Sequence, residues 1–241
     1  MAYRKINVDT VYQKVLAVAN KEQRGYITPQ EFNLFAKQAQ QEVFDNYFHD
    51  VKMAYLKPKN QSDVGDELNM IHEKLSIHRN VNTTAIVESV SEPYIYTTPE
   101  SAYNVTSVNF TNASGQVVEI PEVKRSELHY MLLNPLTSPT LSRPVFVRAS
   151  SGDVEIHPAS FTTNINIHYI ERPEDPLWGY VVISGKALYN SNASTDFDLH
   201  QSEENNLVMR ILTLAGISMK DQLLTGTVMQ DAANTENNKN N

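Results

Sequence analysis

Residues 28–48 read TPQEFNLFAKQAQQEVFDNYF, and they contain the clearest folding signal in the chain. Thr28 has the side chain of a helix N-cap, Pro29 suits the first helical position, and Glu31 completes a capping box. An apolar and largely aromatic face follows at helical spacing: Phe32, Phe35, Ala36, Ala39, Val43, Phe44, Tyr47 and Phe48. The stretch therefore predicts a long helix, and Pro58 should stop it or its extension.

Weaker helical patterns lie on both sides of this stretch. Before it, Asn7 is placed to cap a helix that ends near Asn20. The apolar stripe of that helix is Val8, Val11, Tyr12, Val15, Leu16 and Ala19. After it, a third helix is predicted from about Asp63. Its apolar side is Val64, Leu68, Ile71 and Leu75.

From about Ser76 the pattern changes to short β-rich runs. They occupy residues 84–87, 94–96, 105–110, 117–120, 145–148, 154–156 and 165–169. Turn clusters at 112–115, 150–153 and 190–192 punctuate this region, and one short helix is predicted at 124–133. The connections are too short for a series of parallel crossovers, so the strands are predicted to pair mostly antiparallel.

Helix returns near Ser202, with Leu207, Val208, Ile211, Leu212 and Leu214 as its apolar stripe. The predicted fold class is α+β, in which N- and C-terminal helices form a helical core around a mostly antiparallel β-rich insertion. The predicted domains are 1–75 together with 200–241, and the insertion 76–199. The last helical segment is predicted to bind a partner through four apolar residues. These are Met219, Leu223, Leu224 and Val228.

Composition excludes several classes of function. The chain of 241 residues has no cysteine, which excludes a disulfide scaffold, a thiol nucleophile and a thiolate zinc site. Its net charge of −8 argues against sequence-independent nucleic-acid binding, which needs a basic surface. The sequence shows neither a signal peptide nor an apolar run of roughly 20 residues, so no association with a membrane is expected.

Residues 20–31 match the spacing of an EF-hand calcium loop, with Gly25 at its sixth position and Glu31 at its twelfth. Asn20 replaces the usual first aspartate, however, and Arg24 puts a cation at a ligand position. The favoured interpretation is an ordinary helix–turn–helix junction without a metal. Histidines are scattered, and no phosphate-binding glycine loop or nucleophile elbow is present. The sequence therefore predicts no enzyme and no cofactor.

Three stretches resemble structural and head–tail connector proteins of short-tailed bacteriophages, including the crAss-like group of gut phages. The first combines INVDTVYQKVL (6–16) with ANKEQRGYITPQEFN (19–33). The second is YIERPEDPLWGY (169–180). The third combines DLHQSEENNLV (198–208) with AGI (215–217). Together they touch the beginning, middle and end of the chain.

The resemblance implies a virion structural protein that forms a homo-oligomeric ring, usually a dodecamer, at the head–tail junction. Such a ring binds the portal protein, offers a docking surface to tail proteins, and lets DNA pass through its channel without specific binding. The alternatives are a ring or collar subunit further along the tail and, less favoured, a virion-associated enzyme or a calcium-modulated protein. The aromatic face of residues 32–48 is covered either within the subunit or by a neighbouring subunit.

Overall fold

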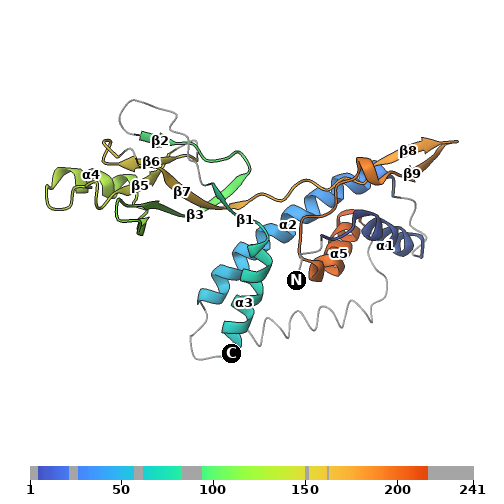
Figure 1. Cartoon of the computed structure of the whole chain (residues 1–241). Helices are drawn as coiled ribbons and strands as arrows, with labels where there is room; N and C mark the ends of the chain where they lie inside the picture. Colours follow the sequence, from blue (N-terminus) through green and yellow to red (C-terminus); the bar gives the residue numbers. More distant parts are fainter. Residues whose placement is uncertain are drawn as a thin grey trace. The chain divides into compact units, whose positions relative to one another are not determined.

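The computed structural model of the chain describes residues 5–21, 27–56, 62–82, 94–149, 152–161 and 163–216. The chain divides into two units (Figure 1). Met1–Ile77 and Pro173–Asn241 form the helical unit, and His78–Arg172 form the β unit. The described residues combine α-helices with antiparallel sheets, which confirms the predicted α+β class.

Four helices are described in the helical unit: α1 (Val8–Lys21), α2 (Pro29–Leu56), α3 (Ser62–Ser76) and α5 (Glu204–Leu214). A short 3-10 turn, Gln201–Glu203, leads into α5. Helix α5 contacts both α1 and α2, and α3 packs along α2. The sequence predicted these four helices with nearly these bounds, because each has a capping residue or an apolar stripe of its own.

Helix α1 begins as its sequence predicts. The Asn7 side-chain oxygen accepts a hydrogen bond of 3.0 Å from the backbone N–H of Thr10, so Asn7 is the N-cap. A carboxylate strengthens this helix start, because Asp196 accepts a hydrogen bond of 2.9 Å from the backbone N–H of Val8. The predicted stripe is buried at Val8, Val11, Tyr12, Val15 and Ala19.

The aromatic face of α2 is covered largely inside the helical unit. Phe32, Phe44 and Tyr47 are buried, whereas Phe35 and Phe48 are half-buried. The ring of Phe32 lies 4.6 Å from that of Tyr12 on α1. Of the two coverings that the sequence left open, the structure therefore supports the one within the subunit for most of this face.

The capping box at the start of α2 is formed. Glu31 Oε2 accepts hydrogen bonds from the Thr28 backbone N–H at 2.9 Å and from the Thr28 hydroxyl at 2.7 Å. In return, the backbone N–H of Glu31 lies 3.3 Å from the Thr28 hydroxyl oxygen. The hydrogen bonds from Thr28, first from its backbone and then from its side chain, hold the pKa of the Glu31 carboxyl below its ordinary value.

Replacing Thr28 by alanine should lower the free energy of unfolding by about 1 kcal/mol, because the N-cap hydroxyl is lost. The chain should still assemble, since the backbone of α2 and its buried face are unchanged. Urea denaturation followed by circular dichroism measures the effect. Ser126→Ala, at an exposed position in the first turn of the helix Arg125–Leu133, is the matched control. A denaturation midpoint that does not move would contradict a capping role for Thr28.

The strands of the β unit form two antiparallel sheets. One has the order β1-β7-β3-β4, with β1 at Arg79–Asn82, β7 at Ile165–Glu171, β3 at Ala102–Thr111 and β4 at Val117–Ile120. The other has the order β2-β6-β5, with β2 at Tyr94–Tyr96, β6 at Val154–His157 and β5 at Val145–Arg148. Helix α4 (Arg125–Leu133) lies between β4 and β5 in sequence. The predicted run 84–87 lies outside the described residues, and β1 was not predicted.

One hydrophobic core lies between the two sheets. It contains Val108 and Phe110 from β3, Ile156 from β6, and Ile165 and Ile167 from β7, all buried. The sheets also join at one point, because the backbone N–H of Phe146 donates to the carbonyl of Pro121 at 3.0 Å and the N–H of Val123 donates back to Phe146 at 2.9 Å. The strands β4 and β5 therefore meet just after β4 ends.

The structure moves the second domain boundary relative to the sequence prediction. Residues 173–199, which the sequence assigned to the β-rich insertion, belong to the helical unit. The reason is local packing, since Trp178 packs on Tyr12 and Phe197 pairs with Ile6 of the same unit. Two strands that the sequence reading missed, β8 (Tyr180–Ile183) and β9 (Lys186–Tyr189), form a hairpin within this segment.

Candidate interaction surfaces

Trp178 anchors the β8–β9 hairpin to the helices. Its indole N–H donates a hydrogen bond of 2.9 Å to Asp9 of α1, and its ring centroid lies 4.5 Å from that of Tyr12. The side chain of Asn33 on α2 bridges the backbone of Trp178, accepting from its N–H at 2.8 Å and donating to its carbonyl at 3.2 Å. Trp178 is buried as a result.

The three stretches on which the resemblance rests are joined by hydrogen bonds in the helical unit. Asp9 and Asn33 come from the first stretch, and Trp178 comes from the second. The third stretch joins the first through Lys14 of α1, whose ammonium group donates a hydrogen bond of 2.6 Å to the carboxylate of Glu204. The residues that the sequence singled out therefore form a structural joint in the helical unit.

The hairpin is short and has one free face. Cross-strand neighbours are Tyr180 with Tyr189, Val181 with Leu188, Val182 with Ala187 and Ile183 with Lys186. The two tyrosine rings lie against Trp178, at centroid distances of 5.8 and 5.7 Å. Because side chains alternate along a strand, Val181, Leu188 and Ile183 share the other face. Those three apolar side chains are about half exposed, at 47%, 49% and 56%.

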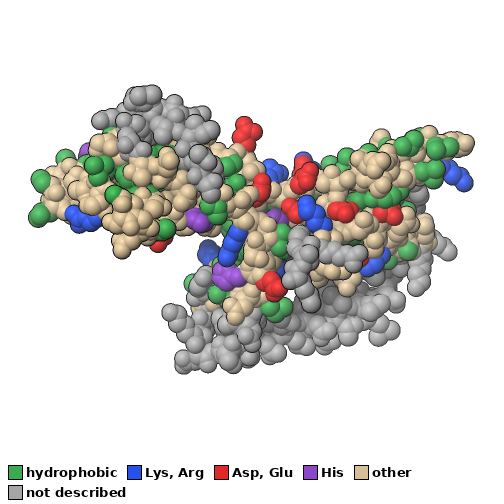
Figure 2. Space-filling view, in the orientation of Figure 1, with side chains coloured by type: hydrophobic (Ala, Val, Ile, Leu, Met, Phe, Trp, Pro, Cys, Tyr) green, Lys and Arg blue, Asp and Glu red, His purple; other side chains and the backbone are tan. Residues whose placement is uncertain are grey.

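A tight two-residue turn connects the two strands of the hairpin. Ser184 and Gly185 have backbone φ angles of 50° and 77°, the pair of positive values that a tight hairpin turn requires. The hairpin extends beyond the helices of its own unit (Figure 1), and hydrophobic side chains gather along it in Figure 2. An isolated two-stranded ribbon is marginal in water, so the joint at Trp178 supports it. We define the side chains of Val181, Ile183 and Leu188 as the hairpin face.

A second apolar surface lies at one end of the β unit, on α4 and the loop that follows it. Its side chains are highly exposed: Tyr130 at 72%, Leu133 at 69% and Leu136 at 84%, with Leu132 and Leu141 at half or more. Large apolar side chains gathered at this exposure are typical of an interaction site. We call this surface the α4 tip.

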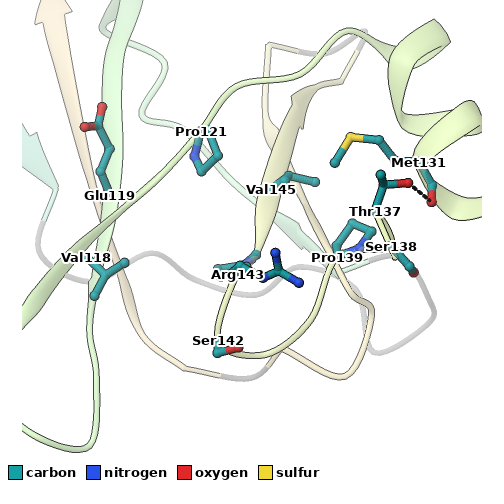
Figure 3. Close-up of a pocket in the computed structure, with 11 residues that line it drawn as sticks. Val118, Glu119, Pro121, Met131, Thr137, Ser138, Pro139, Ser142, Arg143 and Val145 are labelled. Atoms are coloured by element: carbon teal, nitrogen blue, oxygen red, sulfur yellow. Dashed lines mark hydrogen bonds between the residues drawn. The ribbon is translucent and has the colours of Figure 1, made fainter. Parts of the chain in front are cut away.

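A pocket of about 290 Å³ opens beside the α4 tip, between β4 and the start of β5 (Figure 3). Its walls are mostly apolar and consist of Val118, Pro121, Met131, Pro139, Pro144 and Val145. Glu119 on β4 and Arg143 before β5 supply its charged groups; in Figure 3 Glu119 lies at the left and Arg143 near the centre. Thr137 closes one end by donating a hydrogen bond of 3.2 Å to the carbonyl of Met131.

The β unit also contains a buried carboxylate. Glu155 on β6 is buried and is paired with Arg125 on one oxygen and with His157 on the other, where His157 Nε2 lies 2.9 Å away. Burial works to raise the pKa of Glu155. The hydrogen bonds from Arg125 and His157, together with their charges, outweigh burial and hold the pKa below the ordinary value of 4.5. The group ties α4 to the sheet, and both carboxylate oxygens of Glu155 are paired.

The lowered pKa predicts how the stability of this unit depends on pH. A carboxylate with a depressed pKa in the folded state contributes stability that is fully present above its unfolded pKa and is lost as the pH falls through the folded pKa. Thermal unfolding of the wild type and of Glu155→Gln should therefore differ at neutral pH and converge below about pH 4.5. Glu100→Gln, at an exposed position, is the control. A difference that is constant with pH would contradict this role of Glu155.

Several predicted features fall outside the described residues. Met219, Leu223, Leu224 and Val228 do, and so do residues 22–26 of the loop that resembles an EF-hand. In the part of the chain that the structure describes, no cluster of three or more His, Asp or Glu could hold a metal ion. The helices described here include none long and apolar enough to cross a membrane.

The hairpin face and the pocket were both missed from the sequence. The hairpin had a readable signal, because two apolar runs, YVVI and KALY, flank the two-residue turn Ser184-Gly185. The pocket had none, because its walls come from two strands, a loop and helix α4, which only the fold brings together. No protein-family model matches this chain, and no curated protein matches its sequence.

Proposed function

We propose that this chain is a non-enzymatic structural subunit of a tailed-phage virion, which forms a ring and works as an adaptor between the portal and the tail. The observation that carries the proposal is the pair of exposed apolar surfaces, one on each unit of the same chain. The hairpin face belongs to the helical unit, and the α4 tip with its pocket belongs to the β unit.

Two different surfaces of one chain that complement each other produce a head-to-tail contact between copies, and such contacts close into rings when the rotation between copies allows it. A ring of this kind, with a dodecamer as the expected number of copies, would surround a channel through which DNA passes. The net charge of −8 suits a channel wall that does not retain DNA. The resemblance of residues 6–33, 169–180 and 198–217 to head–tail connector proteins points the same way.

The contacts of α5 with α1 and α2 support a helical core made by both ends of the chain, which is the finer arrangement expected of such an adaptor. In this proposal the β unit is the insertion that the core carries. The virion at the head–tail junction would be its location, with assembly in the host cytoplasm. The portal and further tail proteins would be its partners.

Electron microscopy and native mass spectrometry of the purified chain, alone and mixed with the portal, test the proposal. A ring that binds the portal is the expected result. A ring that does not bind the portal but binds another tail component would instead favour a collar subunit further along the tail. A chain that remains a monomer in every mixture would contradict the ring.

The C-terminal residues give a separate prediction. We expect truncation after Ser218, which removes Met219, Leu223, Leu224 and Val228, to leave the fold intact and to weaken portal binding. Circular dichroism measures the first effect and co-sedimentation with the portal measures the second. Truncation after Gln230, which keeps the four apolar residues, is the control. Equal portal binding by the shorter chain would contradict a docking role, and loss of the fold would assign the segment to the subunit core.

A further inference from the structure

We propose that the hairpin face of one copy docks into the β4–β5 pocket of a second copy, with Ile183 entering the pocket and Lys186 pairing with Glu119. The inference rests on the proposed ring and names the contact between its subunits. It follows from the chemistry of the two surfaces, which complement each other in polarity, size and charge.

The hairpin has an unusual charge balance for this protein. Between Asp175 and Asp196 the only charged side chain is Lys186, although the whole chain has a net charge of −8. Lys186 is the cross-strand neighbour of Ile183, so the Lys186 ammonium group and the Ile183 side chain share one face of the hairpin near its turn. The surface that complements this end is an apolar recess with an acidic group at its edge.

The pocket has these properties. Glu119 is the acidic residue that lines it, and the remaining walls are mainly valine, proline and methionine. Its volume of about 290 Å³ is at the low end for a small-molecule site, which suits one or two aliphatic side chains. Within the described residues neither Glu119 nor Arg143 forms an ion pair. Arg143 can therefore donate to the carbonyl groups of the hairpin turn while Glu119 binds Lys186.

Other pairings of the same surfaces are less favourable. Two hairpin faces placed together would leave Lys186 without an acidic partner, because no Asp or Glu lies between Asp175 and Asp196. The α4 tip offers no acidic side chain between His129 and Arg143, so it cannot pair with Lys186 in the same way. The pocket of a second copy provides both the apolar recess and the charge. Repeated from copy to copy, this is the head-to-tail contact that a ring needs.

Engineered disulfides test the contact in a chain that has no cysteine of its own. Ile183→Cys and Val118→Cys are introduced in separate chains, one of them tagged, and the two are mixed and oxidised. A heterodimer should form, because a disulfide needs Cα atoms roughly 4.4–6.8 Å apart. The control replaces Ile183→Cys by Val182→Cys, on the opposite hairpin face, and should give about tenfold less heterodimer. Since each chain has one cysteine, a heterodimer can only join two copies.

Charge reversal provides the second test. Lys186→Glu and Glu119→Lys should each weaken self-association at least about tenfold, and the double variant should restore it. Lys52→Glu and Glu100→Lys make the same charge changes at exposed positions elsewhere and should have no effect. Sedimentation velocity measures the association of every variant.

The outcomes separate this inference from the proposed function. A wild-type ring that gives no preferred heterodimer, and that both charge reversals leave unchanged, would overturn the hairpin contact while the ring stands. A wild-type chain that stays monomeric, alone and with the portal, would overturn the ring and the contact together. Weakening by single reversals without recovery in the double variant would also count against the Lys186–Glu119 pair.

Discussion

Replacing Trp178 by alanine should lower the free energy of unfolding of the helical unit by about 4 kcal/mol. The indole is buried, contacts Tyr12, Tyr180 and Tyr189, and donates a hydrogen bond to Asp9. Alanine leaves a large cavity at the point where α1 and the hairpin meet. The tyrosines that support the hairpin lose their common packing partner, so the hairpin should also lose its fixed position.

Trp178→Phe separates packing from hydrogen bonding. It keeps an aromatic ring against Tyr12 but removes the indole donor to Asp9, and we expect a cost of about 1–2 kcal/mol. Because the chain has a single tryptophan, both variants lack the natural fluorescence reporter, and urea denaturation is followed by circular dichroism. Equal stability of the wild type and the alanine variant would show that Trp178 is not the joint described here.

Replacing Gly179 by alanine should destabilise the same unit by about 3 kcal/mol through steric overlap. A Cβ at this position would overlap the carbonyl oxygen of Ala193 and lie 2.6 Å from its carbonyl carbon. Both are backbone atoms, and the turn that contains them is fixed by hydrogen bonds from Gly179 to Ser194 at 3.0 Å and from Asn190 to Gly179 at 2.9 Å. The turn cannot shift away from the added methyl group without breaking those hydrogen bonds.

The fluorescence of Trp178, which is next to Gly179 in the sequence, measures this loss of stability directly in a denaturation experiment. Two controls define the cause. Gly115→Ala lies in an open turn with no atom within 4 Å of the added carbon, and its positive φ of 78° should cost only about 1 kcal/mol. Adding Ala193→Gly to Gly179→Ala should not restore stability, because the main overlap is with backbone. Recovery in that double variant would place the overlap on the Ala193 side chain instead.

Local sequence determined the secondary structure of most described elements. The Thr28–Glu31 box and the Asn7 cap depend on neighbours three residues apart, and both form hydrogen bonds as predicted. The strands at 117–120 and 145–148 coincide with their β-rich runs because alternation and turn residues are also local signals. The α+β class with antiparallel sheets follows from these elements. The ring, the portal and the tail partners remain proposals.

Only the tertiary structure decided which surfaces the chain exposes. The sequence left open whether the aromatic face of α2 is covered within the subunit or by a neighbouring one; α1, α3 and α5 contact this helix, and Phe32, Phe44 and Tyr47 are buried. Val181 and Ile183, in a hairpin that was not predicted, are exposed because only the opposite face of the hairpin packs on Trp178. The hydrogen bond between Trp178 and Asp9 joins two residues that are 169 positions apart in the sequence. The periodicity of apolar residues in the sequence shows which side chains share one face of a helix or strand. Whether that face is buried depends on which distant element packs against it in the folded chain.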